Sequence, residues 1–321
     1  MARVAIIGAG ISGLSAAKLM PEHEVVIFEK SWRPGGRVTT RSHDQSSFDH
    51  GAQFFTVHTL VFSEFLAPLV DAKVIVPWPA RFVEMNGHQV VLSRIWSDEP
   101  CHYVGMPSMS HVGQYLAQGL KMIYDVEIKK LQRQSGSWQL VDQNGQYYLN
   151  FDWVILAVPA LQALALVHPH MPAWGSLADV NMQGCYSYML AFDEDFDLGF
   201  DAAVVKHKNI SWIAANRSKP GRKGQPTLLV HSTNQWADAH MALGLDEVKV
   251  YLRKELESVV SIPHPVLEDI HRWRFANYRR RPMQTFVDMD KQLAVCGDWC
   301  HQGRVEAAFL SAKNTVEAMG V

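Results

Sequence analysis

The sequence is poor in cysteine and nearly balanced in charge. Its 321 residues include four cysteines, which show no paired framework of the kind that crosslinks small secreted domains. Lysine and arginine number 30 and aspartate and glutamate 32, so the formal net charge is only −2. No overall field therefore favours nucleic acid or an anionic membrane. We expect reduced thiols, a cytoplasmic protein and no nucleic-acid partner.

The sequence also lacks a long hydrophobic run. The longest apolar stretch extends from Trp153 to Val167 and is interrupted by Pro159 and Gln162, whereas a membrane-spanning helix needs about 20 apolar residues. The first residues enter the apolar run Val4–Ile7 without the basic segment and cleavage site of a secretory signal. We expect neither a signal peptide nor membrane contact. We also find no internal repeat and no low-complexity tract.

The strongest motif lies in the first thirty residues. A strand-like run leads into Gly8-Ala9-Gly10-Ile11-Ser12-Gly13, a helical pattern follows, and a second apolar run ends at Glu29. In such a unit the three glycines allow a tight turn, close approach to a pyrophosphate and close packing of helix on strand. The acid, about 20 residues later, can accept hydrogen bonds from ribose hydroxyls. The stretch predicts a dinucleotide site; the alternative is an ordinary βαβ unit with chance glycines.

A second glycine turn, Gly35-Gly36-Arg37, follows this fingerprint. A glycine doublet before arginine favours a turn that brings backbone and a guanidinium group close to an anion, although a plain surface turn has the same pattern. Further on, Gly51-Ala52 stands near the aromatic pair Phe54-Phe55. That arrangement suits backbone lying against a flat ring or, alternatively, a strand end with core phenylalanines.

Apolar patterning divides the rest of the chain into two kinds of segment. Helical spacing covers 59–69, 105–120, 245–260 and 305–319, and strand patterns cover 73–94, 125–131, 137–142, 146–151, 154–158, 185–192, 210–215, 227–232, 271–276 and 293–298. The run 154–158 is typical of a buried parallel strand. We predict an α/β fold in which a Rossmann-type nucleotide-binding domain (1–72, 105–160 and 285–321) alternates with an inserted, largely antiparallel substrate domain (73–104 and 161–284).

Taken together, these motifs resemble the flavin amine oxidase superfamily. The residues from Gly8 to Gly13 with Glu29, the doublet before Arg37, and Gly297-Asp298 followed by Val305-Glu306 look like its FAD-binding signatures. More narrowly, the stretches 49–55, 105–110, 216–220, 271–273 and 296–300 resemble the bacterial renalases. The resemblance implies one noncovalent FAD in a two-domain fold similar to that of hydroxybenzoate hydroxylase.

The resemblance further implies an activity. It suggests an oxidase of isomeric dihydro-NAD(P), in which the hydride sits at ring position 2 or 6. The hydride would pass to flavin N5 and then to dioxygen, and the products would be hydrogen peroxide and NAD(P)⁺. The implied partners are a dihydronicotinamide dinucleotide and dioxygen.

The resemblance also assigns cofactor contacts. The dinucleotide and ribityl contacts would come from Gly8, Gly10, Ile11, Ser12, Gly13, Glu29, Lys30, Gly36, Arg37, Val126, Gly297 and Asp298. Gln53 and Phe54 would lie along the isoalloxazine ring. A helix opening at Val305-Glu306 would direct its dipole toward the flavin's pyrimidine side. Two departures stand out: relatives often have Tyr in place of Phe54, and Gly at one or more of the positions of Ala307, Ala308 and Ala312. The first puts the substrate contacts in doubt.

Five residues are candidates for substrate binding. They are Phe54, Asn216, Arg217, His231 and Trp273. His231 could bond the substrate carboxamide, and Asn216 and Arg217 could bind its polar arm, Arg217 as a bidentate phosphate ligand. The alternatives are a core histidine, a packing tryptophan and a surface arginine. No acid–base residue is expected, because a dihydronicotinamide already carries a transferable hydride.

Other interpretations remain at this stage. A flavin amine oxidase would need an aromatic cage and often a lysine near N5, and the sequence does not identify that lysine. A non-enzymatic flavin-binding sensor is a third possibility. The basic triplet Arg279-Arg280-Arg281 is weak as a nucleic-acid signal on a nearly neutral protein. Cys296 and Cys300 cannot complete a zinc site by themselves, so no metal is expected.

Overall fold

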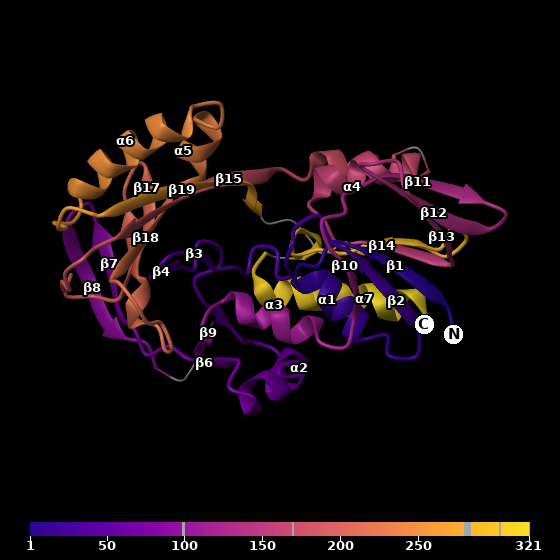
Figure 1. The fold of residues 1–321 in the computed structure, drawn as a ribbon, viewed down its shortest axis with the longest axis horizontal. Helices are drawn as coiled ribbons and strands as arrows, with labels where there is room; N and C mark the ends of the chain where they lie inside the picture. Colours follow the sequence, from indigo (N-terminus) through magenta and orange to yellow (C-terminus); the bar gives the residue numbers. More distant parts are fainter. Residues whose placement is uncertain (98–99, 169, 279–283, 302, 321) are drawn as a thin grey trace. The chain divides into compact units, whose positions relative to one another are not determined.

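The structure, a computed structural model, describes residues 1–97, 100–168, 170–278, 284–301 and 303–320. The described chain forms two compact units (Figure 1). Unit 1 comprises Met1–Arg37, Gly113–Met182 and Tyr278–Val321, and unit 2 comprises Val38–Val112 and Gln183–Asn277. The basic triplet Arg279–Arg281 lies outside the described residues.

Unit 1 is built on a six-stranded sheet. Its order is β10 (Lys121–Ile123), β2 (Glu24–Phe28), β1 (Arg3–Ile7), β14 (Trp153–Leu156), β21 (Leu293–Val295) and β20 (Phe286–Asp288). Neighbouring strands are parallel except for the antiparallel pair β20 and β21. The run predicted as a buried parallel strand is β14, whose four residues are all buried. Its continuous apolar sequence follows from burial on both faces.

Helices and a small sheet complete unit 1. Helix α1 (Ile11–Lys18) packs against α7 (Val305–Met319), whose bounds agree with the predicted 305–319. Strands β11 (Ile128–Gln134), β12 (Ser137–Asp142) and β13 (Tyr147–Phe151) form a separate antiparallel sheet. Helix α4 (Ala160–Val167) and the 3-10 segment Pro172–Asp179 contribute to the same apolar core.

Unit 2 is built on a seven-stranded sheet. Its order is β19 (Leu267–Tyr278), β15 (Met182–Ala191), β18 (Thr227–Ser232), β17 (Ile210–Ala215), β16 (Ala202–Lys206), β7 (Arg81–Asn86) and β8 (Gln89–Ile95). Strands β16 and β7 pair in parallel, and the pairs β15–β18, β17–β18, β16–β17 and β7–β8 are antiparallel. The largely antiparallel character predicted for this part is therefore observed.

One face of this sheet is covered by helices. Helix α6 (Leu245–Glu257) and α5 (Asn234–Ala239) lie along it (Figure 1), and α6 contributes Val248, Leu252 and Leu256 to the core there. Side chains alternate along a strand. The strand residues that do not point into this core therefore point to the opposite face of the sheet. On that face lie Trp212 of β17 and His231 of β18, which are paired across the two strands.

The remaining elements of unit 2 are short. Strands β3 (Arg41–His43) and β4 (Ser46–Phe48) form a hairpin, and β5 (Phe55–Thr56), β9 (His102–Gly105) and β6 (Ile75–Pro77) form a three-stranded sheet. Helix α2 (Leu60–Asp71) begins after Thr59, whose hydroxyl accepts a hydrogen bond from the Phe62 amide. Helix α3 (Ser110–Ala117) crosses from unit 2 into unit 1.

The segment boundaries differ from the predicted ones. The chain first leaves unit 1 after Arg37 rather than after residue 72, and it later changes unit at 112/113, 182/183 and 277/278. The first difference has a clear cause, since α2 packs on β6 of unit 2. Helix α5 and strands β10 and β16 were not anticipated.

Candidate functional site

The glycine fingerprint forms the turn between β1 and α1, and its three glycines differ in their surroundings. A Cβ atom on Gly8 (φ +103°) would lie 2.5 Å from the Ala157 carbonyl oxygen, and one on Gly13 would lie 2.0 Å from the Gly8 carbonyl oxygen. A Cβ atom on Gly10 would meet no atom within 4 Å. Two glycines are therefore required by packing, whereas Gly10 leaves room for a bound molecule.

Glu29 supports this turn from the end of β2. Its buried carboxylate accepts hydrogen bonds from the amides of Ala9 (2.7 Å) and Ser31 (2.8 Å). Its carbonyl accepts from the Val126 amide at 3.0 Å. Lys30, next in the chain, is exposed. The acid at the expected ribose position thus also fixes the loop conformation.

The second glycine turn lies directly against the first. The Gly35 amide donates to the Ala9 carbonyl at 2.8 Å, and Gly36 (φ +58°) is so close that a Cβ atom there would be 3.1 Å from the Cα of Gly10. Arg37 follows and pairs with Asp298, with Nη1 donating to Oδ2 at 3.1 Å and Nη2 to Oδ1. Residues far apart in the sequence, and both expected at the cofactor, therefore meet.

Two helix N-termini of unit 1 match an anionic dinucleotide. Helix α1 begins at Ile11, followed by Ser12, and α7 begins at Val305, followed by the buried Glu306. Neither N-cap residue, Gly10 or Arg304, makes a side-chain capping bond among the described residues. The N–H groups of a helix N-terminus can bind phosphate. Together with the space at Gly10, they make unit 1 suited to FAD. Gly297, before Asp298, donates its amide to Ser311 Oγ at 3.0 Å.

A buried ionic cluster lies at the centre of unit 2. Asp49 accepts hydrogen bonds from Lys219 Nζ (3.0 Å), Arg222 Nη2 (2.5 Å), Thr40 Oγ1 (2.5 Å) and the Met109 amide (3.2 Å). Burial raises the pKa of Asp49, but Lys219, Arg222 and Thr40 outweigh it and lower the pKa to about 2. Burial lowers the pKa of Lys219 to about 8, with Arg222 adding to the shift and Asp49 opposing it. One carboxylate is thus the counter-ion of two cations.

Gln53 and Phe54 have different surroundings. The Gln53 side-chain carbonyl accepts from Lys219 Nζ at 3.2 Å, and the ammonium lies 5.2 Å from the centre of the Trp78 ring. Phe54 packs with Trp96, His102 and Trp212, at centroid distances of 4.7, 5.1 and 5.7 Å. A continuous aromatic surface therefore adjoins the ionic cluster.

His231 and Trp273 meet at one backbone carbonyl. The His50 carbonyl accepts from Trp273 Nε1 at 2.9 Å and from Ser187 Oγ at 2.6 Å. It also bonds the His231 ring, which raises the pKa of His231. Burial outweighs this bond, with a further contribution from the Lys219 charge, and lowers the pKa of His231 to about 4. His231 is therefore neutral at physiological pH, with Nε2 buried and without a hydrogen-bond partner in the described chain.

The two remaining substrate candidates lie elsewhere. Asn216 is fully buried, and its amide donates to the Ser47 carbonyl at 2.9 Å. Arg217 is exposed and pairs with Asp195. In the described structure these contacts fix a loop, and neither side chain joins the aromatic surface.

Sequence reasoning missed three residues of this region. Lys219 appeared only within the motif 216–220, while Arg222 and Trp212 were not singled out at all. Nothing local marks a lysine or arginine for burial, because each is solvated on its own and is buried only when a distant partner compensates its charge. Trp212 lies in a correctly predicted strand, but its neighbours on that face come from other strands.

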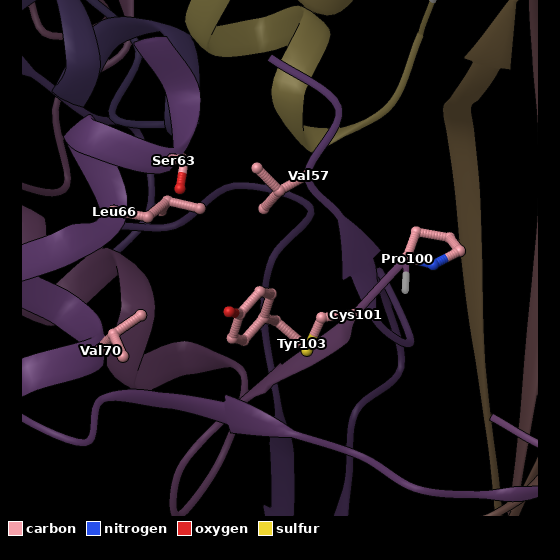
Figure 2. Close-up of a pocket in the computed structure, with 7 residues that line it drawn as sticks. All are labelled: Val57, Ser63, Leu66, Val70, Pro100, Cys101 and Tyr103. Atoms are coloured by element: carbon pink, nitrogen blue, oxygen red, sulfur yellow. The ribbon is translucent and has the colours of Figure 1, made fainter. Parts of the chain in front are cut away.

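A separate cavity of about 240 Å³ lies beside α2 of unit 2. Figure 2 shows its lining, with Ser63, Leu66 and Val70 on the helix and Cys101 and Tyr103 at β9; Val57 and Pro100 complete it. It includes none of the predicted site residues. Among the described residues, no cluster of His, Cys, Asp and Glu could hold a metal ion, and no helix has the length and apolarity needed to cross a membrane.

Comparison with known proteins gives matches over most of the chain. A model described as NAD(P)-binding Rossmann-like domain matches residues 6–69, and one described as flavin containing amine oxidoreductase matches residues 80–320. Renalase from Mus musculus is 23% identical in an alignment 326 residues long that covers 92% of this chain and 92% of that one. L-amino acid oxidase from Cerastes cerastes is 52% identical over 48 residues, 14% of this chain and 9% of that one.

Solved structures share the fold. A putative protoporphyrinogen oxidase from Exiguobacterium sp. 255-15 aligns with a TM-score of 0.79 at 12% identity, covering 99% of this chain and 98% of that one. A putrescine oxidase triple mutant aligns with a TM-score of 0.71 at 12% identity, with the same coverage. The α/β fold class predicted from the sequence, with its Rossmann-type part, is confirmed.

Proposed function

The chain belongs to the flavin-containing amine oxidoreductase family, and we propose that it oxidises isomeric dihydronicotinamide dinucleotides. It is an FAD-dependent oxidoreductase. The proposed substrates are 2- or 6-dihydro-NAD(P), the acceptor is dioxygen, and the products are NAD(P)⁺ and hydrogen peroxide. Its similarity to renalase over 92% of the chain supports this choice.

The observation that carries the proposal is the charge balance of unit 2. The buried charged side chains described there are Asp49, Lys219 and Arg222, one carboxylate against two cations. They adjoin an aromatic surface and the neutral His231. Such surroundings favour a ligand with a flat, uncharged ring at one end and anionic groups at the other. A dihydronicotinamide dinucleotide has this form.

The residues of the chain need only bind and orient. FAD, held by unit 1, would supply the hydride acceptor, flavin N5. In our proposal Phe54 and Trp273 pack against the nicotinamide ring, and His231 contacts its carboxamide. Asn216 and Arg217 remain candidates for the polar arm, for which Arg217 would have to exchange Asp195 for a substrate phosphate. Orientation at hydride distance can supply a large part of the rate enhancement.

Amine oxidation is the second candidate, and Lys219 favours it. This buried lysine lies beside the Trp78 ring. It is a candidate for the lysine that a flavin amine oxidase often has near flavin N5. The same cluster opposes it electrostatically, since an alkylammonium substrate would meet an excess of buried positive charge. We therefore rank it below the dinucleotide hypothesis.

Anaerobic stopped-flow absorbance separates these hypotheses. Oxidised holoprotein is mixed with borohydride-generated dihydro-NAD isomers and, separately, with a panel of primary and secondary amines. We expect the isomers to bleach the visible flavin absorbance and the amines to leave it unchanged. Failure of the isomers would reject the proposal. Rapid bleaching by an amine would establish the second candidate, and no reduction by either would favour a flavin-binding sensor.

A further inference from the structure

Two nitrogen atoms on neighbouring strands of unit 2 are buried and without a hydrogen-bond partner in the described chain. They are Trp212 Nε1 and His231 Nε2. Their residues are directly paired between β17 and β18 (Figure 1), and paired side chains on one face have Cβ atoms about 5 Å apart. An unpaired buried polar atom is costly, so two of them on directly paired residues point to a ligand that would satisfy both.

The two atoms have opposite hydrogen-bonding character. An indole N–H can only donate. The His231 ring bonds the His50 carbonyl, and because Nε2 has no partner among the described residues, that bond belongs to Nδ1. A nitrogen bonded to a carbonyl must carry the proton, so the neutral ring presents Nε2 as an acceptor. The pair thus offers one donor and one acceptor.

We propose that Trp212 and His231 form a donor–acceptor pair that recognises a primary carboxamide. The ligand's carbonyl oxygen accepts from Trp212 Nε1, and its NH₂ group donates to His231 Nε2. This inference rests on the proposed function, since a nicotinamide ring carries that group. It adds Trp212 as a specificity-determining residue and fixes the tautomer of His231.

A side chain must shift for the ligand to reach these atoms. Phe54 is partly exposed and packs on Trp212 with ring centroids 5.7 Å apart. The other described rings near Trp212 are those of Phe82 and Trp96, and both are buried. Of these three rings, Phe54 is the one that is not buried.

Two analogues of NAD⁺, each changed only in the carboxamide, test the halves of the pair separately. The 3-acetylpyridine analogue of NAD⁺ keeps the carbonyl and lacks the NH₂ donor. The thionicotinamide analogue keeps the NH₂ group and replaces the oxygen by sulfur, a poor acceptor. Binding is measured on oxidised holoprotein by the perturbation of the flavin spectrum, without turnover. The wild type is expected to bind NAD⁺ about three- to tenfold more tightly than either analogue, which corresponds to one net hydrogen bond.

Variants then assign each half to a residue. Trp212→Phe should remove the preference for NAD⁺ over the thio analogue and keep the preference over the acetyl analogue, while His231→Leu should do the reverse. Trp236→Phe is the matched control, since Trp236 lies in α5, in the core on the helix-covered face of the sheet, and should change neither ratio. A merely structural role would weaken all three ligands equally.

The outcomes separate this inference from the proposed function. Equal binding of all three dinucleotides by the wild type, or a variant that shifts both ratios together, would overturn the carboxamide pair. If the isomers still bleach the flavin in that case, the proposed function stands. If none of the three dinucleotides binds and the isomers do not bleach the flavin, both fail.

Discussion

The ammonium nitrogen of Lys219 lies 3.0 Å from a carboxylate oxygen of Asp49, and both side chains are entirely buried. Arg222, almost as deeply buried, shares the same oxygen atom. The two cations come from one loop and the carboxylate from a segment 170 residues away. This cluster therefore ties the two parts of unit 2 together.

Removing the carboxylate should cost much more stability than removing one cation. Asp49→Asn leaves two buried cations without a counter-charge, and such changes cost about 3–5 kcal/mol. Lys219→Met removes one cation and leaves Asp49 paired with Arg222, so we expect a smaller loss. Urea unfolding measures both. Asp195→Asn, which breaks the exposed pair with Arg217, is the matched control and should cost less than about 1 kcal/mol. An equal loss of unfolding free energy in Asp49→Asn and Asp195→Asn would contradict the role of Asp49 as the buried counter-charge.

The lowered pKa of Lys219 makes stability depend on alkaline pH. Its pKa falls from 10.5 to about 8 on folding, so between these values the unfolded chain holds a proton that the folded chain has released. The free energy of unfolding should therefore rise with pH in this window, with a limiting slope of about 1.4 kcal/mol per pH unit from this group. The comparison is wild type against Lys219→Met, which should lack this component. Parallel pH profiles for the two proteins would exclude the titration.

The fingerprint glycines should separate cofactor binding from folding. Gly10→Ala places a methyl group in open space, so the apoprotein should keep its Tm while its affinity for FAD falls by at least about tenfold, because close backbone approach to the pyrophosphate is lost. Gly13→Ala drives a methyl group to 2.0 Å from a carbonyl oxygen and should lower the Tm of the apoprotein itself. Thermal melts and FAD titration measure the two effects. A large loss of apoprotein stability in Gly10→Ala would contradict this division.

One cysteine should react far faster than the other three. Cys185, Cys296 and Cys300 are buried, and burial raises the pKa of the first two thiols to about 12 and that of the third well above its usual value. Cys101 is partly exposed and lines the cavity of Figure 2. Because the thiolate is the reactive form, a thiol reagent should label the native protein at one site, as counted by mass spectrometry. Cys101→Ser should abolish that labelling, and persistent labelling of the variant would refute the assignment.

Local patterns accounted for the elements that are set by neighbouring residues. Helix α7 and strands β17 and β18 have the predicted bounds, because apolar periodicity and flanking breakers act over a few residues. Helix α2 was also recognised, but its domain was not, since nothing in its own sequence indicates that it packs on β6.

The sequence by itself determined the nucleotide-binding part of this protein. A strand, three spaced glycines, a helix and an acid form one continuous stretch, and the backbone conformation that they require is local. The tertiary structure alone decided the charge state and hydrogen bonding of unit 2. The pKa values of Asp49 and Lys219 depend on burial and on which distant groups the fold brings near. The same holds for the nitrogens of Trp212 and His231, which are without a partner in the part of the chain that the structure describes. Burial and long-range pairing are not encoded in any short segment.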